Sequence, residues 1–461
     1  PSLTFSGSEE YEIADDANIN TNAAYAKKDF SIVMETGANV TSRQLIYEEG
    51  GSTNGINIYI DNGLFYFHIW SQSTSWGGTG ANAVYVTGTA APNTAYILSY
   101  SYQLDGAGDA VLEGFINGQS VGTSTASNGG NAVLNAHSDE GGLGGVIGST
   151  LCHDGNNPGN FSGEIAELVY YSESPYNDTR RIIIENHFSA KYNIALSANQ
   201  KYPSIFSAGY PNELAGIGQF SSSDNHGDAQ GTAIVRIKNP TSLGTNDFLL
   251  WAHDGATSAI TIAPENIPGV DNRMHRVWRA SEPGGDVGGV NISFDLNAFP
   301  IASPGDLVLL VDLDDGVFTN CIQYPIDNFL GGVAQFNNIN LDHGNWFTIG
   351  SKNITTPLPI ELLTFELYQN KSSVDLYWET ASETDVSHYN IQVKGEDAST
   401  ISYLGQVNAA GNSTTLQYYT YKDRTPKNGI SYYRLEIIDQ NGEKDYSNWL
   451  AADSLKNQSL N

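Results

Sequence analysis

Apolar and polar residues alternate along most of this chain in short runs, which is the pattern of β-strands with one buried face. Runs such as LTFSG, EYEIA, KDFSIVMET and RQLIYEEG are bounded by Gly, Asn and Asp, residues that favour turns. The clearest hairpin is INIYIDNGLFYFHIW, in which two alternating strands flank Asp61-Asn62-Gly63. A second hairpin is predicted around Asn117-Gly118. The pattern predicts an all-β protein.

One segment changes from the two-residue period to a helical one. Ile184, Phe188 and Tyr192 recur at four-residue spacing, which predicts an amphipathic helix over about residues 177–192. Asn177 is a suitable N-cap at its start. A single helix that closes a β-rich region indicates that a domain ends near residue 200.

The rest of the chain divides at changes in composition. Residues 201–354 contain strand patterns interrupted by Asn, Asp, Pro and Gly, and no helix pattern. The stretch TTPLPIELL is a proline-bearing linker. Residues 355–455 carry about seven strand patterns, the spacing of an immunoglobulin-like or fibronectin-III-like sandwich. We therefore expect three domains, 1–200, 201–354 and 355–455, followed by a polar tail, 456–461.

Charge excludes some classes of partner. The 461 residues include 51 acids and 21 bases, for a formal net charge of −30. Such a chain repels nucleic-acid phosphates and anionic bilayers. No run of 18 apolar residues could span a membrane. The dispersed acids are typical of the solvated surface of a secreted protein, and divalent cation sites are a second use of the same charge.

The chain has two cysteines, Cys152 and Cys321, on opposite sides of a predicted domain boundary. A disulfide would require those two domains to touch at this point. We predict two separate free thiols.

Several segments resemble known families. The segments LTFSGSEEYEIADD, FINGQSVG and FSGEIAELVYYSESP resemble parts of the laminin-G-like, concanavalin-A-like jelly-roll domains of secreted bacterial proteins, and FSAKYNIAL resembles a helical extension of Bacteroidetes members. The stretch around RVWRASEPGGDVGGVNISFDL is similar to a β domain of unestablished role that often follows. LPIELLTFELYQN and the strands after it resemble the fibronectin-like module found before type IX secretion sorting domains. These resemblances imply an exported protein, extracellular or attached to the outer cell surface.

Glycan binding is the main hypothesis for the first domain, because sugars stack on exposed aromatic rings and bond to nearby amides and carboxylates. By strand parity one face of the first hairpin carries three rings, and the Gly/Ser/Asn-rich loop after it carries a further tryptophan. The alternative is that the rings pack beneath a neighbouring strand. The candidate ligand residues are Tyr66, His68, Trp70, Gln72, Trp76 and Asn82.

Calcium is the second hypothesis, and the laminin-G-like resemblance implies it. Candidate ligands are Asp139 and Glu140 in one loop and Asp154 and Asn156 in another. The two loops flank one strand and emerge at its opposite ends, so they do not readily share one ion. The alternative is a set of ordinary Asx turns.

A third acidic group, Asp312, Asp314 and Asp315, does not match an EF-hand, in which Gly comes one residue later. We interpret it as a hairpin turn.

The chain lacks the common catalytic motifs HExxH, GxSxG, a Walker loop and CxxC. The adjacent carboxylates Glu48 and Glu49 point to opposite faces of one strand, so the pair does not form a glycosidase dyad. We therefore predict a non-enzymatic, three-domain, all-β protein that binds a polysaccharide or glycoconjugate. The alternatives are a polysaccharide hydrolase or lyase, and a structural surface protein with a protein partner.

Overall fold

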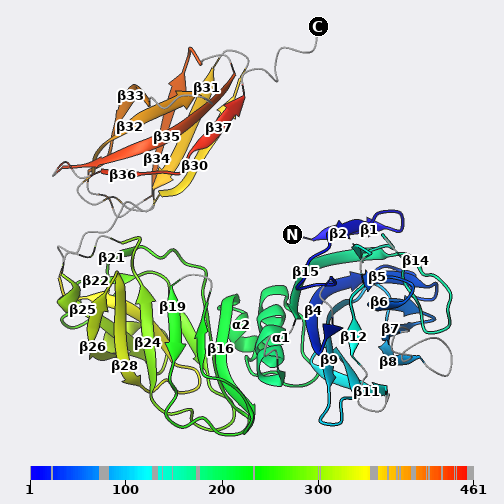
Figure 1. Cartoon of the computed structure of the whole chain (residues 1–461). Coiled ribbons are helices and arrows are strands. Elements are labelled where there is room, and N and C mark those ends of the chain that lie inside the picture. Colours follow the sequence, from blue (N-terminus) through cyan, green and yellow to red (C-terminus); the bar gives the residue numbers. More distant parts are fainter. Residues whose placement is uncertain are drawn as a thin grey trace. The chain divides into compact units, whose positions relative to one another are not determined.

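A computed structural model of the chain confirms the all-β prediction, with one long helix in the described residues (Figure 1). It describes residues 2–21, 24–71, 83–126, 133–137, 139–147, 149–172, 177–231, 234–299, 301, 303–353, 362–370, 373–380, 383, 386–395, 401–411, 413, 416–426, 429–440, 442 and 444–453. Contacts divide the chain into two compact units. The first comprises Pro1–Gly255, Trp278–Ile292 and Asn337–Asn345, and the second Ala256–Val277, Ser293–Phe336 and Trp346–Asn461.

The first unit begins with a jelly-roll-like sandwich of two sheets that share one hydrophobic core. One sheet has the order β1-β15-β4-β9-β10-β11. The other has the order β2-β13-β5-β6-β7-β8, with β14 parallel to β5, and β3 pairs with β12 alone. The strands are β1 (Leu3–Ser6), β2 (Tyr11–Ile13), β3 (Ala24–Tyr25), β4 (Lys27–Thr36), β5 (Gln44–Gly50), β6 (Asn54–Asp61), β7 (Leu64–Ser71), β8 (Val84–Thr89), β9 (Ala95–Leu104), β10 (Ala110–Ile116), β11 (Gln119–Ala126), β12 (Leu134–Asn135), β13 (Gly141–Leu143), β14 (Gly159–Asn160) and β15 (Ser162–Ser172).

Both predicted hairpins are confirmed. β6 and β7 are joined through Asn62 and Gly63, whose φ angles are 49° and 76°. Asn117 and Gly118 join β10 and β11 with φ angles of 49° and 80°. Two consecutive left-handed residues match the right-handed twist of the strands, which is why Asn-Gly is favoured there.

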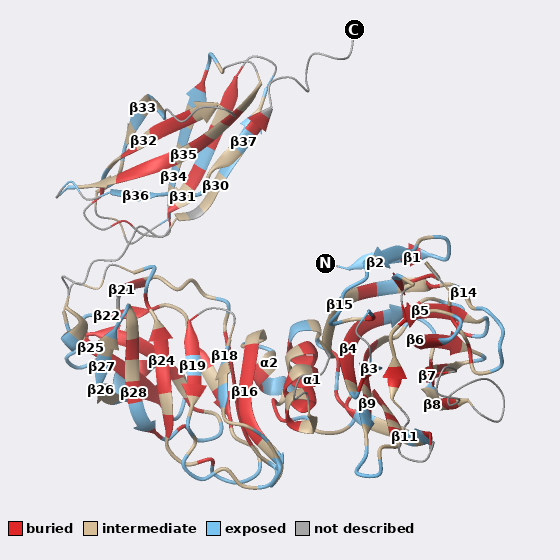
Figure 2. Ribbon diagram, in the orientation of Figure 1, coloured by how far each residue is buried: buried red, intermediate tan, exposed pale blue. Residues whose placement is uncertain are grey.

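β4 is buried on both faces (Figure 2). Its inward residues Phe30 and Ile32 lie in the jelly-roll core, and Val33 on the outward face packs under the helix α1 (Asp178–Tyr192). Lys28, which is also inward, forms a fully buried ion pair with Glu49 of β5. A strand covered on both sides is expected to be among the last parts of the sandwich to open.

The helix α1 confirms the helical prediction and has two apolar faces. Asn177 accepts a hydrogen bond from the N–H of Arg180 at 3.1 Å, and Asn193 ends the helix with φ of 54°. Phe188 packs against β4 and β9, while Ile183 packs against the strands that follow the helix. The helix therefore both closes the jelly roll and supports the next strands.

One carboxyl group beneath α1 makes folding pH-dependent. Asp29, on the outward face of β4, is 1% exposed, and its burial raises its pKa to about 7 against the opposing influence of Ser101 and Lys27. Asp178 and Arg181 of α1 also act on it, in opposite directions.

We expect the first unit to lose stability as pH rises from about 4 to 7, because the folded state keeps a proton that unfolded aspartate has already released. The loss is on the order of 3 kcal/mol. Urea unfolding of the full chain across this pH range measures it, and Asp29→Asn should flatten the profile. An equal slope in the variant would assign the effect to other groups, such as Glu185, whose pKa burial also raises.

The remaining strands of the first unit follow the helix. β16 pairs with β17 and β20, β20 pairs with β23, and β18 pairs with β19. The sequence predicted no helix after residue 202, but α2 (Ser204–Ser207) forms a single turn there; it is too short to show a helical period. The strands are β16 (Asn212–Ser221), β17 (Asp224–His226), β18 (Asp228–Gln230), β19 (Val235–Lys238), β20 (Asp247–His253) and β23 (Trp278–Ser281).

In the second unit, β29 pairs with β22 and β25, and a separate sandwich follows along the chain. This sandwich has a three-stranded sheet, β30-β31-β34, and a five-stranded sheet built on β33-β32-β35. Its core includes Trp378, Tyr389 and Tyr433. β24 (Val290–Asp295) and β28 (Val333–Ile339) have residues in both units. The other elements are β21 (Ile260–Ile262), β22 (Asn272–Met274), η3 (Pro304–Asp306), β25 (Leu307–Asp312), η4 (Phe318–Asn320), β26 (Ile322–Pro325), β27 (Asn328–Leu330), β29 (Trp346–Ser351), β30 (Leu362–Gln369), β31 (Val374–Thr380), β32 (Val386–Gly395), β33 (Ser402–Asn408), β34 (Gln417–Asp423), β35 (Ile430–Asp439), β36 (Lys444–Tyr446) and β37 (Leu450–Asp453).

Both cysteines are free thiols, Cys152 in the first unit and Cys321 in the second. Neither helix in the described residues is long and apolar enough to cross a membrane.

Candidate functional site

The outward face of β6 and β7 is covered by a later part of the chain, residues 149–153. The amide of Asn57 donates to the Thr150 hydroxyl at 2.8 Å and to the Leu151 carbonyl at 3.1 Å. The His68 ring bonds to the same Leu151 carbonyl at 2.8 Å. The face that strand parity separates from the core is therefore itself largely buried.

Burial of this face corrects two of the predicted ligand contacts. His68 and Trp70 are both 0% exposed, and their rings stack on each other with centroids 5.3 Å apart. The indole N–H of Trp70 donates to the Gly51 carbonyl at 3.0 Å. A ring enclosed in this way offers no face to a sugar, so the alternative of packing beneath a neighbouring segment holds for both. Three other predicted ligand residues lie outside the described residues: Gln72, Trp76 and Asn82.

Tyr66 is different, because it lies where the covering segment ends and is only half-buried. Its ring stacks on Tyr59 with centroids 4.8 Å apart and on His153 at 4.5 Å. Tyr85 of β8, also half-buried, lies 5.6 Å from Tyr66 and 4.9 Å from His153. We call Tyr66, Tyr85 and His153 the aromatic rim. Burial lowers the pKa of His153, so its ring is neutral near pH 7.

Arg43 places two carboxylates beside the aromatic rim. Its guanidinium donates to Asp61 at 2.6 Å and 3.1 Å, and to both oxygens of Asp154 at 2.7 Å and 2.8 Å. These bonds hold the pKa of Asp154 well below its usual range. The rim thus combines ring faces with fixed, charged hydrogen-bonding groups, the two components of a sugar site.

The same contacts argue against Asp154 and Asn156 as calcium ligands. Both oxygens of Asp154 already bond to Arg43, and the backbone and side-chain N–H groups of Asn156 donate to them at 3.1 Å and 2.9 Å. A guanidinium in contact with the carboxylate repels a divalent cation. This loop is an Asx turn, the alternative that the sequence left open.

The second predicted calcium loop contains Asp139 and Glu140. One carboxylate oxygen of Asp139 accepts from the Ser149 hydroxyl at 2.7 Å, and its carbonyl accepts from the buried amide of Asn20 at 3.0 Å. Glu140 is exposed. Calcium needs six to eight oxygens. In the part of the chain that the structure describes, neither loop contributes to a cluster of three metal-capable side chains.

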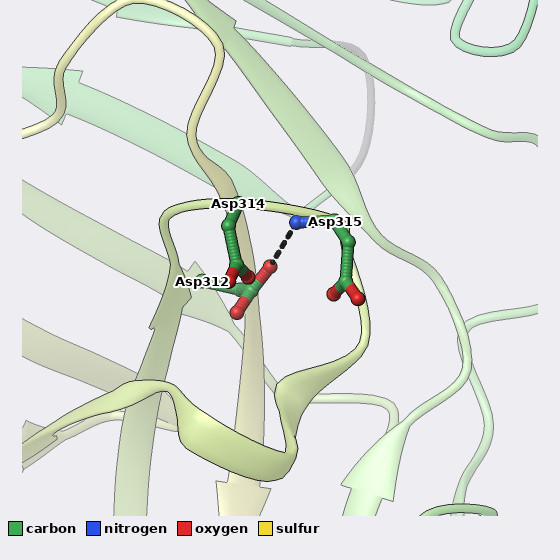
Figure 3. Close-up of side chains that lie close together, drawn as sticks. All are labelled: Asp312, Asp314 and Asp315. Atoms are coloured by element: carbon green, nitrogen blue, oxygen red, sulfur yellow. Dashed lines mark hydrogen bonds between the residues drawn. The ribbon is translucent and has the colours of Figure 1, made fainter.

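Such a cluster does form at Asp312, Asp314 and Asp315, whose oxygens lie within 4.8 Å of one another (Figure 3). Asp312 ends β25, is 1% exposed, and accepts the N–H groups of Asp315 at 3.1 Å and Gly316 at 2.6 Å. These are the bonds of a turn between β25 and β26. They support the interpretation of this acidic group as part of a turn. The connection between the two strands is nine residues long, which is longer than a tight hairpin turn.

The sequence did not single out Arg43, Tyr85 or His153. Tyr85 lies in the alternating run VYV, and this alternation could have identified it as an aromatic residue on the strand next to β7. His153 directly precedes one of the proposed calcium ligands. Nothing local marks Arg43, because its role depends on a carboxylate 111 residues away.

A separate cavity of about 360 Å³ lies within the first unit, between α1 and β16–β18. Asp228, at its edge, is paired with Arg236 outside the cavity at 2.6 Å. Burial and the Arg180 charge lower the pKa of His226 on its wall. The lining residues are Tyr171, Arg180, Ile183, Ile184, Leu214, Ala215, Gly216, His226, Asp228, Ala229 and Gln230.

Residues 184–345 match the model of a domain of unknown function, DUF8202. The match begins inside α1 and covers the strands after it, in agreement with the packing of the helix against them. No curated protein sequence matches the chain.

Several solved structures share a likeness of fold with the chain. The CBM40 of the Ruminococcus gnavus IT-sialidase, bound to α2,3-sialyllactose, is 14% identical over 37% of this chain and 89% of its own, with a TM-score of 0.27. The botulinum neurotoxin serotype D binding domain is 10% identical over 91% and 86%, with a TM-score of 0.29. Domains LG4–5 of mouse laminin α1 are 9% identical over 98% and 82%, with a TM-score of 0.23. Likenesses this weak carry no conclusion about a ligand.

Proposed function

We propose that the chain is a carbohydrate-binding protein that acts outside the cell or on its surface, and that the aromatic rim of the jelly roll holds the glycan. The observation that carries this proposal is the arrangement of Tyr66, Tyr85 and His153 beside Arg43 and its two carboxylates. A sugar ring can stack its C–H face on the exposed part of the rim, while its hydroxyl groups bond to the carboxylates.

We propose binding without turnover. Glu49 points into the core, where it bonds to Lys28, and Glu48 lies under the covering segment, where it accepts the N–H of Ile147 at 3.2 Å. The two carboxylates therefore do not face one cleft, as a glycosidase pair must. Beside the rim, the Arg43 guanidinium holds the pKa of Asp154 well below its usual range, so this carboxylate stays ionised and is unsuited to act as a general acid.

A glycan array on the full chain, with and without EDTA, tests this proposal, and variants locate the site. We expect Tyr85→Ala to weaken binding of the best glycan about tenfold, through loss of one stacking face. The matched control is Tyr11→Ala, which removes a 45% exposed ring from β2, at the opposite edge of the same sheet. Arg180→Ala is a second control, in the cavity beside α1.

Each outcome of this experiment decides something. If glycan binding is lost in Arg180→Ala and kept in Tyr85→Ala, the glycan site is in the cavity beside α1 and not at the aromatic rim. Absence of binding to any glycan, or release of shortened sugars, would overturn the proposal. Binding that fails in EDTA and returns with calcium would support the calcium-assisted form, with Asp139 and Glu140 as the loop to test.

A further inference from the structure

The second unit carries a row of three exposed tyrosines on the outer face of the three-stranded sheet. Tyr368 of β30 is 56% exposed, Tyr377 of β31 is 42% exposed and Tyr418 of β34 is 67% exposed. Strand register places Tyr368 opposite Asp375 and Tyr418 opposite Glu379. Successive tyrosines are thus displaced by two positions along β31, so they form a diagonal row, which we call the tyrosine row.

Each member of the tyrosine row has a carboxylate directly across from it on the next strand. The partners are Asp375 for Tyr368, Glu366 for Tyr377 and Glu379 for Tyr418. Lys422, bonded to Asp375 at 3.0 Å, is the single base among the described residues on this face. Three acids against one base leave the face negatively charged, as is the chain as a whole.

The rings are not arranged as a platform for a flat sugar chain. Tyr368 and Tyr377 meet edge to face, with centroids 5.5 Å apart and ring planes at 82°. A hydrogen bond of 2.7 Å from the Tyr368 hydroxyl to Glu366 holds the Tyr368 ring in this orientation. Perpendicular rings flanked by carboxylates suit a cation, which is attracted to ring faces and neutralised by the acids.

The spacing of the row indicates the form of such a ligand. Diagonal cross-strand neighbours lie ~7–8 Å apart. In an extended peptide, side chains on one side recur every second residue, about 6.8 Å apart. Basic residues at alternate positions of an extended segment therefore match the spacing of the strand positions that carry the row, and they match its charge.

We propose that the outer face of β30, β31 and β34 binds an extended segment of a partner protein that carries lysine or arginine at every second position. This binding surface is separate from the aromatic rim and does not depend on glycan binding there. The tyrosine rings supply cation–π contacts, and Glu366, Asp375 and Glu379 supply the opposite charge.

The test uses the full chain and a fluorescein-labelled peptide KSKSK, with binding followed by anisotropy. We expect Tyr377→Ala to weaken binding about fivefold, and Tyr377→Phe, which keeps the ring face, to change it by less than about twofold. Tyr403→Ala is the matched control: this ring is 59% exposed and lies on the opposite sheet of the same sandwich. Raising salt from about 0.1 M to 1 M should abolish most of the binding, because the screening length falls from about 10 Å to about 3 Å.

Three further comparisons complete the test. The peptide KKKSS has the same charge at a different spacing, and equal affinity for the two peptides would overturn the proposed register. Undiminished binding in Tyr377→Ala, or displacement of KSKSK by neutral cellohexaose, would overturn the proposal, the latter in favour of a glycan on this face. Tyr85→Ala at the aromatic rim should leave peptide binding intact, so the two proposals fail separately.

Discussion

Replacing Lys28 with alanine is expected to destabilise the jelly roll by about 3–5 kcal/mol, because it leaves a buried carboxylate without its counter-charge. The Lys28 ammonium lies 2.5 Å from Glu49, and both side chains are 0% exposed. The ammonium also donates to the Ile19 carbonyl and lies 4.0 Å from the centroid of the Tyr25 ring. Burial alone would raise the pKa of Glu49, but Lys28 and His137 hold it below its usual value.

A second variant distinguishes the effect of the unpaired charge from the effect of lost packing. Lys28→Met with Glu49→Gln removes both charges and keeps an oxygen for the hydroxyl of Tyr47, which bonds to Glu49 at 3.1 Å. We expect this double variant to recover at least half of the lost stability. Hydrogen exchange of the β4 and β5 amides measures both variants within the full chain. Lys28→Met alone keeps most of the buried volume and leaves Glu49 unpaired; if it is as stable as the double variant, unpaired charge is not the cause of the loss.

Glu383→Leu is expected to destabilise the sandwich of β30–β37 by about 3–5 kcal/mol, through loss of a buried acceptor that several donors share. Glu383 is 2% exposed. One of its oxygens accepts the hydroxyls of Tyr389 and Tyr419, each at 2.6 Å, and the other accepts the N–H groups of Ala410 at 2.7 Å and Gly411 at 3.2 Å. The Thr380 hydroxyl also donates to the first oxygen, at 3.0 Å, so leucine leaves five donors without this partner.

Glu383→Gln is the matched variant, since it keeps the shape and one acceptor oxygen. We expect it to cost about half as much as leucine. Hydrogen exchange in β31, β32 and β34 localises the change, and the jelly-roll amides serve as an internal reference. A leucine variant as stable as the parent would show that water or other groups satisfy these donors.

Some features of the candidate surfaces follow from local pattern. In β31 successive side chains point to opposite faces, so Tyr377 points away from the core that contains Trp378. An outward tyrosine at this position was therefore predictable from the local sequence. Its neighbours in the tyrosine row were not, because strand pairing brings β30 and β34 to β31 from different distances along the chain. Alternation marks a face, whereas register decides which side chains share it.

The sequence by itself determined many of the strands, both Asn-Gly hairpins and the helix α1, because each depends on a two-residue or four-residue period, or on local turn chemistry. Only the tertiary structure decided what covers the other face. His68 bonds to a segment some 80 residues later, Trp70 bonds to Gly51 from the preceding strand pair, Asp29 lies under a helix about 150 residues away, and Arg43 pairs with Asp154 across 111 residues. Burial and charge pairing are set by contacts between distant segments. A short period along the chain carries no information about which segment arrives, and so it could not distinguish a ligand face from a covered one.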